Sequence, residues 1–226
     1  MDNSELLLNN TYYNEVANLN SINMFHGQLY ETIVTTANTL FEKNAAPIGV
    51  VCKDEKHIVI YLDQSNHTAK NIVENGEFMV NITTNPLLFT YSTIGDLDDE
   101  YFTEFNDFPL LKNTLGFFKA HVIKDTKHTK EDNIGKQNIH IITAEVESIF
   151  VSECDGIKPI NRAMSCVIES LIHYSRFESS STDKRNEYWI RILELNRIAQ
   201  KVGSTDEKKS MRIILNKLEE KYGFKK

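Results

Sequence analysis

The chain has 226 residues, of which 41% are hydrophobic, and its formal net charge at pH 7 is −7. A chain of this length can bury the core of one good-sized domain, or of a domain with a helical appendage. The negative charge argues against a broad nucleic-acid interface and against binding to an anionic membrane surface. The apolar runs are too short to span a membrane, and the N-terminus lacks the basic and apolar regions of a signal peptide, so we expect a cytoplasmic protein.

The N-terminal segment, residues 1–27, is rich in Asn and Ser and carries few periodic signals. Residues 6–8 and 19–24 pack a short helix in it, or the segment stays partly loose. Beyond it, stretches rich in β-branched residues predict strands at residues 28–36, 45–52 and 57–62. Residues 38–44 are predicted to be a loop. Strands in such close succession, with turns roughly every 8–12 residues, favour a barrel or a sandwich.

Residues 67–83 predict a short helix followed by a strand. Ala69, Ile72 and Val73 recur on one helix face, and Gly76 follows where a helix C-cap needs a positive φ. Alternating apolar and polar residues then predict the strand. The helix start combines unpaired N–H groups, partial positive charge and short polar side chains. That combination either holds a phosphate or caps an ordinary helix.

Residues 85–113 interrupt this pattern and are predicted to be a solvated loop with a few buried aromatic residues. Its acidic cluster consists of Asp96, Asp98, Asp99 and Glu100. The spacing of this cluster does not match the calcium-loop signature, so no metal is expected there. Strand composition returns at residues 116–124 and 139–151, and the polar segment between them, 125–137, is predicted to be a loop.

After Pro159 the hydrophobic period changes from that of strands to that of helices. One amphipathic helix is predicted at residues 160–177, with Leu171 on its apolar stripe, and a second at residues 187–202. Ser204, followed by Glu207, has the capping-box pattern of a third helix. We expect the three helices to pack together as a structural subdomain, which divides the chain into residues 1–27, 28–155 and 156–226.

Sequence patterns for nucleophilic catalysis and for metal binding are absent. The cysteines are odd in number and far apart, which argues against a disulfide framework and a zinc site; they are Cys52, Cys154 and Cys166. We expect reduced thiols. The scattered histidines His121, His128 and His140 are interpreted as ordinary core or surface residues. GxSxG, HExxH and the P-loop do not occur, so the catalytic residues stay unknown.

Three blocks of the sequence resemble known flavoproteins. HTAKNIVENGEFMVNIT, at residues 67–83, is similar to the Thr-Ala-x-Asn-Ile and Phe-x-Val-Asn stretch of flavin-reductase-like FMN-binding split barrels. ETIVTT, at residues 31–36, and NAAPIGV, at residues 44–50, resemble a narrower group, the DUF447 family of split-barrel flavoproteins. A weaker similarity extends over residues 161–177. The resemblance implies a mainly β fold with added helices, namely an FMN-binding split β-barrel followed by the C-terminal three-helix subdomain.

The resemblance also implies where FMN lies. A grip on its phosphate is expected from Asn66, His67 and Thr68 at the helix start. A backbone-lined slot for its isoalloxazine ring is expected from Thr35, Thr36, Asn44, Ala45, Ala46 and Pro47. In the family pattern an Arg or Lys often stands where this chain has His67. Because a histidine carries less charge at pH 7, either the grip is weaker or Lys70 or a residue from elsewhere assists. For the two threonines, a plain strand is the alternative.

The expected function is flavin-dependent redox chemistry with FMN, with NAD(P)H as a candidate electron donor. A chain without a nucleophile–base pair suits this function, because the cofactor carries the hard chemistry. The resemblance further implies a homodimer with FMN near the subunit interface. Two alternatives stay open: a deazaflavin or haem in the same slot, and a non-catalytic FMN-binding or interaction protein.

Overall fold

The computed structural model describes residues 5–132, 135–152 and 157–224. The chain divides into two compact units, Met1–Ile160 and Asn161–Lys226. The boundary expected between residues 155 and 156 lies outside the described residues. The three-part division of the chain stays a prediction.

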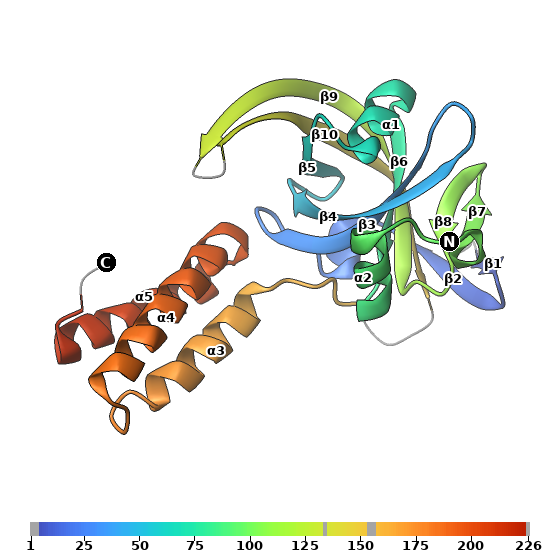
Figure 1. The fold of residues 1–226 in the computed structure, drawn as a ribbon. Coiled ribbons are helices and arrows are strands. Elements are labelled where there is room, and N and C mark those ends of the chain that lie inside the picture. The colour runs from blue at the N-terminus through green and yellow to red at the C-terminus, as the bar shows by residue number, and fades with distance from the viewer. Residues whose placement is uncertain (1–4, 133–134, 153–156, 225–226) are drawn as a thin grey trace. The chain divides into compact units, whose positions relative to one another are not determined.

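The first unit is built on six antiparallel strands that close into a barrel (Figure 1). They are β3 (Leu29–Ala37), β4 (Lys43–Cys52), β5 (His57–Asp63), β6 (Glu77–Ile82), β9 (Gly116–Asp132) and β10 (Gly135–Ser152). The hydrogen-bonded order is β10-β5-β4-β3-β6-β9, and pairing of β9 with β10 closes the ring. Alternate residues of each strand point inward, and Val34, Val50, Ile60, Val80 and Ile142 are fully buried in the barrel core.

The barrel is open along part of β4, and this opening makes it a split barrel. β4 pairs with β3 over nine residue positions, from Lys43 to Val51. It pairs with β5 only at Val50, Val51 and Cys52. Within the described residues, positions 43–49 of β4 therefore lack a strand on their β5 side. Helix α1 (His67–Asn75) contacts β3, β4 and β5 at this end of the barrel. The predicted fold class is confirmed.

The N-terminal segment contributes a hairpin and one turn of 3-10 helix. Strands β1 (Glu5–Leu8) and β2 (Thr11–Val16) pair with each other, and β2 also pairs with residues 149–152 of β10. Residues 6–8 are therefore a strand and not part of a helix, because they pair with β2. The 3-10 helix η1 (Leu19–Ile22) lies within the segment for which a short helix was one of two expectations. Leu19 and Ile22 are fully buried, because this helix packs on the barrel core.

The prediction of a solvated loop at residues 85–113 is wrong. The segment holds helix α2 (Pro86–Ile94), the 3-10 helix η2 (Asp99–Tyr101) and a hairpin of β7 (Phe102–Phe105) and β8 (Phe108–Leu111). Phe105 lies 5.3 Å from Phe117 and 5.1 Å from Phe150 between ring centroids, in edge-to-face geometry. These aromatic contacts attach the hairpin to the barrel.

The prediction of a loop at residues 125–137 is also wrong, because β9 and β10 continue as a two-stranded ribbon (Figure 1). A ribbon with solvent on both faces has no apolar alternation, so its sequence resembles a loop. The predicted loop at residues 38–44 is shorter than expected, since β3 extends to Ala37 and β4 begins at Lys43.

The second unit is the expected three-helix subdomain, formed by α3 (Ala163–Ser175), α4 (Thr182–Val202) and α5 (Thr205–Tyr222). The capping box at Ser204 and Glu207 is present. The expected stripe on α3 is only partly buried. Val167 and Phe177 enter the helical core, whereas Leu171 is 48% exposed. Its neighbours Met164, Ile168 and Ile172 are also exposed.

Candidate functional site

Helix α1 starts and ends as its sequence predicts. The side-chain oxygen of Asn66 accepts a hydrogen bond from the backbone N–H of Ala69 at 2.8 Å, so Asn66 is the N-cap. Gly76 ends the helix with φ of 73°. The N–H groups of His67 and Thr68, in the first turn, have no acceptor inside a helix. The helix start therefore offers main-chain donors and partial positive charge to an anion.

The loop before α1 is fixed by Asp63. Its carboxylate accepts hydrogen bonds from the hydroxyl of Ser65 at 2.5 Å and from the backbone N–H of Ser65 at 2.8 Å. These two bonds lower the pKa of Asp63, so its carboxylate keeps a negative charge beside the loop. An anion at the helix start must therefore be held by donors strong enough to offset this charge.

A buried hydrogen-bond network joins α1 to two strands of the barrel. The side-chain amide of Asn44 donates to the hydroxyl of Thr36 at 3.2 Å and to that of Thr68 at 3.0 Å. The side-chain amide of Asn71 donates to Thr36 at 3.0 Å. Thr36 and Thr68 are almost fully buried. Three residues predicted separately for the phosphate and the ring are thus brought together, and both hydroxyls keep a proton that they can donate.

The other predicted ring-slot residues lie on the opposite face of the same strands. Thr35 pairs with Ala45 in the ladder, and both side chains point out of the barrel. The hydroxyl of Thr35 donates to the backbone oxygen of Pro109 at 2.5 Å and accepts from the side-chain amide of Asn81 at 3.0 Å. Thr35 therefore holds the β7–β8 hairpin, and its side chain does not face α1.

The alternation of β4 divides the predicted slot. Asn44 and Ala46 share the inward face, since Ala46 pairs with the inward residue Val34, whereas Ala45 and Pro47 share the outward face. The six side chains cannot line one surface. The four of them that lie on β4 belong to its segment at positions 43–49, whose main chain lacks a β5 partner within the described residues. A ligand ring at this edge would meet backbone N–H and C=O groups.

Two asparagines that the residue-level predictions left out hold this site together. Asn71 and Asn81 are the asparagines of the Thr-Ala-x-Asn-Ile and Phe-x-Val-Asn patterns. Asn81 donates to the backbone oxygen of Ile33 at 3.0 Å and accepts from the backbone N–H of Leu111 at 2.9 Å. The helical spacing of Asn71 from Thr68 was the available signal, because residues three apart share a helix face.

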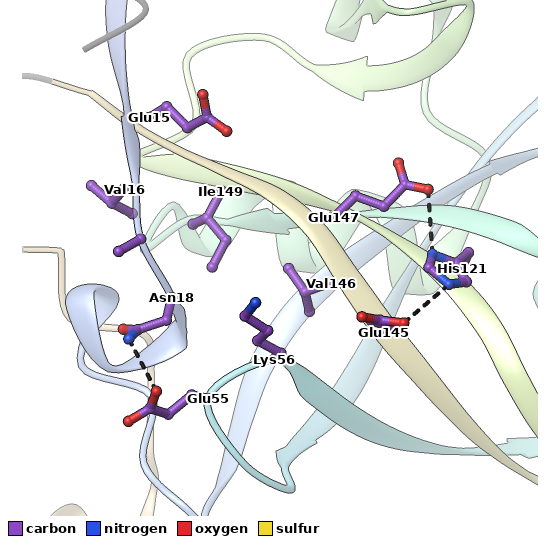
Figure 2. Close-up of a pocket in the computed structure, with 11 residues that line it drawn as sticks. Glu15, Val16, Asn18, Glu55, Lys56, His121, Glu145, Val146, Glu147 and Ile149 are labelled. Carbon is purple, nitrogen blue, oxygen red and sulfur yellow. Dashed lines mark hydrogen bonds and ion pairs between the residues drawn. The ribbon is translucent and has the colours of Figure 1, made fainter. Parts of the chain in front are cut away.

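A cavity of about 460 Å³ lies elsewhere, between β2, the β4–β5 turn and β10 (Figure 2). Its polar lining includes Glu15, Glu55, Lys56, His121, Glu145 and Glu147. The His121 ring lies 3.5 Å from a carboxylate oxygen of Glu145 and 3.3 Å from one of Glu147. The cavity contains none of the predicted site residues. Its carboxylates would repel an anionic group, so it suits an anion less well than the N-terminus of α1 does.

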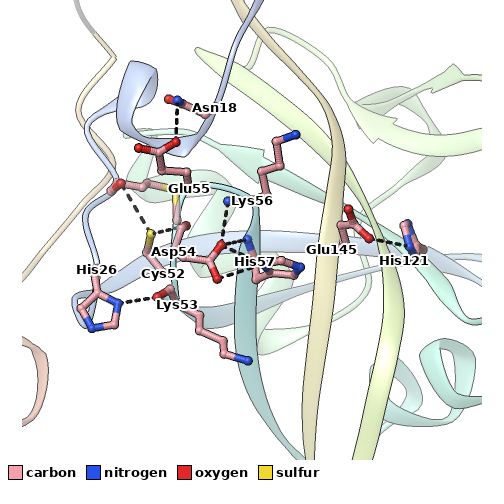
Figure 3. A network of polar contacts seen from close by, with 11 residues as sticks. Asn18, His26, Cys52, Lys53, Asp54, Glu55, Lys56, His57, His121 and Glu145 are labelled. Carbon is pink, nitrogen blue, oxygen red and sulfur yellow. Dashed lines mark hydrogen bonds and ion pairs between the residues drawn. The ribbon is translucent and has the colours of Figure 1, made fainter.

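The β4–β5 turn beside this cavity is structural (Figure 3). The carboxylate of Asp54 accepts from the backbone N–H groups of Lys56 and His57 and lies 2.8 Å from the ring nitrogen Nδ1 of His57. The buried thiol of Cys52 donates to the backbone oxygen of Asp54 at 3.2 Å. Burial, with the nearby Asp54 charge, raises the pKa of Cys52 to about 11, so its thiolate is scarce at neutral pH.

The described cysteines and acids do not form a metal site. Cys52 and Cys166 are free thiols, and Cys154 lies outside the described residues. Across residues 5–132, 135–152 and 157–224, no group of three or more His, Cys, Asp or Glu side chains is placed to hold a metal ion. In the same residues, no helix is long and apolar enough to cross a membrane.

The fold and the site define a split-barrel protein with an appended helical subdomain, and the comparisons agree. The chain belongs to the DUF447 family. The family's N-terminal domain, described as "Protein of unknown function (DUF447) N-terminal domain", matches residues 30–151, and its C-terminal part, described as "Protein of unknown function (DUF447)", matches residues 161–216. The uncharacterized protein MJ1453 of Methanocaldococcus jannaschii is 30% identical over 193 residues, which cover 83% of this chain and 97% of that protein.

Solved structures of two other proteins are similar to this chain. The FMN-bound DUF447 protein MM1853 from Methanosarcina mazei is 26% identical, with a TM-score of 0.49 over 88% of this chain and 98% of that one. The styrene monooxygenase flavin reductase SMOB from Pseudomonas putida S12 is 13% identical, with a TM-score of 0.44 over 57% of this chain and 82% of that one.

Proposed function

We propose that the protein binds FMN at the open edge of β4, beside the N-terminus of α1, and uses it for flavin-dependent redox chemistry. The observation that carries the proposal is the main-chain edge of β4, unpaired within the described residues, next to the capped N-terminus of α1. Both are fixed by one network, in which Asn44 on β4 hydrogen-bonds Thr68 on α1. A phosphate and a flat polar ring need these two features.

This chain's own residues would bind and orient the cofactor. The N–H groups of His67 and Thr68 suit the phosphate, and the exposed side chains of His67 and Lys70 suit its charge. The main chain of Ala45 and Ala46 suits the ring edge, because small side chains leave backbone groups accessible. When bound, FMN supplies hydride or electron transfer, so the protein needs no nucleophile of its own.

Family membership supports the choice of cofactor. The M. mazei protein that was obtained with FMN belongs to DUF447, as this chain does. FMN is therefore the first cofactor to test, ahead of a deazaflavin or a haem. The absorption spectrum of the purified protein distinguishes these cofactors. Flavin maxima, or their appearance after FMN is added, are expected. A colourless protein that ignores added FMN would refute the proposal.

The redox part of the proposal needs a separate test, since a non-catalytic FMN-binding or interaction protein is the alternative. We expect NADH or NADPH to bleach the bound flavin under anaerobic conditions and an added acceptor to restore its colour. A flavin that stays oxidised with both nucleotides and is reduced only by dithionite would favour a binding protein.

We also propose a cytoplasmic homodimer with FMN near the subunit interface, as the resemblance implies. A two-fold dimer is the commonest assembly, and it would cover a main-chain edge left open in one copy. Light scattering should give a mass near twice the 26.0 kDa of one chain. A monomer that retains FMN would contradict an interface site.

A further inference from the structure

An almost fully buried imidazole lies at one end of the barrel. His140, on β10, is 7% exposed, and its ring nitrogen Nδ1 lies 2.8 Å from both carboxylate oxygens of Asp125 on β9. A carboxylate at Nδ1 fixes the orientation of the ring and keeps the proton on that nitrogen. The second nitrogen, Nε2, makes no hydrogen bond to any residue in the part of the chain that the structure describes.

The strand register places His140 at the end of the barrel that α1 covers. His140 pairs with Leu62 near the end of β5, and both belong to the inward-facing rows of their strands. Two residues before His140, the backbone oxygen of Asn138 accepts from the backbone N–H of Gln64 at 3.0 Å. Gln64 belongs to the loop that leads into α1, so this loop is fastened to β10 beside His140.

The polar network at the same end belongs to other strands. Thr36 lies at the end of β3 and Asn44 at the start of β4, and both are bonded to side chains of α1. The barrel end under α1 is thus lined by hydroxyl, amide and imidazole groups, whereas most of the interior is apolar. Nε2 of His140 has no hydrogen-bond partner among the described residues, and it is not one of the buried atoms that lack a partner, so it is open to a ligand from outside the chain.

We propose that Nε2 of His140 donates a hydrogen bond to an anionic oxygen of the ligand held at the N-terminus of α1. This inference rests on the proposed function, in which that oxygen belongs to the FMN phosphate. Held between the Asp125 carboxylate and the anionic oxygen of the ligand, the imidazole donates to Asp125 through Nδ1 and to the ligand through Nε2. His140 thereby supplies a side-chain donor in addition to the exposed side chain of His67.

The test compares FMN with riboflavin, which lacks the phosphate, on the full-length protein by flavin fluorescence. His140→Gln should raise the Kd for FMN about tenfold or more, because a hydrogen bond to a charged group is lost. The Kd for riboflavin should change less than about twofold, which is within the usual scatter of such a comparison. His128→Gln, on the exposed part of β9, is the matched control and should change neither affinity.

A merely structural role for His140 predicts a different result. If the His140–Asp125 pair only holds β9 to β10, His140→Gln would weaken the binding of FMN and of riboflavin equally, or would weaken neither. Either result would overturn the inference. If His140→Gln does not fold, Asp125→Asn takes its place: a fall in the preference for FMN over riboflavin supports the inference, and an unchanged preference overturns it. Wild-type protein that binds no FMN refutes the proposed function itself, and this inference with it.

Discussion

Amide side chains of asparagine hold the candidate site together. Asn66 caps α1, Asn44 and Asn71 tie it to the strands, and Asn81 fastens the β7–β8 hairpin. An amide offers two donors and one acceptor, so one side chain can satisfy groups from several elements. In this chain, the site is therefore assembled by neutral hydrogen bonds, which leaves its main-chain donors free for a ligand.

The hydroxyl of Thr68 is expected to matter for stability as well as for FMN. Thr68→Val keeps the shape of the side chain but leaves the amide of Asn44 without this acceptor. We expect the free energy of unfolding to fall by about 0.5–1.5 kcal/mol, the net contribution of one hydrogen bond, because Asn44 is half-buried and keeps its bond to Thr36. Urea denaturation of the purified variant measures this change. Thr68→Ser, which keeps the hydroxyl, is the control, and an equal loss in both variants would contradict the role of the hydrogen bond.

Acid should weaken the β4–β5 turn through Asp54. Burial alone would raise the pKa of this carboxyl, but hydrogen bonds from the Lys56 and His57 N–H groups and from the His57 ring outweigh it, so the pKa is lowered from 3.8. The ionised form is thus favoured in the folded state. Its contribution is present above pH 3.8 and is lost as the pH falls through the folded-state pKa. Stability curves of wild type and Asp54→Asn should converge in that acid range, and curves that stay parallel would contradict this linkage.

At the scale of elements, the hydrophobic period alone predicted that the apolar stripe of α3 is buried, and this prediction is only partly correct. The expected cost of about 2–5 kcal/mol for a buried Leu→Ala change does not apply to Leu171, which is 48% exposed. It applies instead to Leu218 on α5, which is fully buried. Leu171→Ala should cost less than about 1 kcal/mol. Thermal unfolding of the two variants checks this order, and a larger loss for Leu171→Ala would show that another surface covers it.

Short hairpins were the elements most easily missed from the sequence. Asn9 and Asn10 turn between β1 and β2, and Asn106 and Asp107 turn between β7 and β8; all four residues have positive φ. Asn and Asp tolerate this conformation better than other residues, so paired Asn or Asp between strand formers is a usable signal. The ribbon at the end of β9 and β10 gave no such signal, because its residues are polar on both faces.

At the scale of the whole molecule, the hydrophobic period predicted the three helices. The strand pattern favoured a barrel or a sandwich, and only the resemblance to known flavoproteins implied the split barrel. The candidate site could be predicted only as separate motifs. The contact among Thr36, Asn44 and Thr68 depends on how β3, β4 and α1 pack together. Such packing is a long-range property of the fold. That Thr35 and Ala45 face away follows from the strand register, which the sequence does not define. The opening of β4 toward β5 likewise depends on where one pairing ends.

The place of FMN binding is the central claim, and hydrogen–deuterium exchange with and without saturating FMN tests it most directly. Unpaired or newly bonded main-chain amides report ligand contact residue by residue. We expect FMN to slow exchange at residues 43–49 of β4 and in the first turn of α1, and to leave residues 145–149, which line the 460 Å³ cavity, unchanged. Slower exchange at residues 145–149 with no change in β4 would contradict the account.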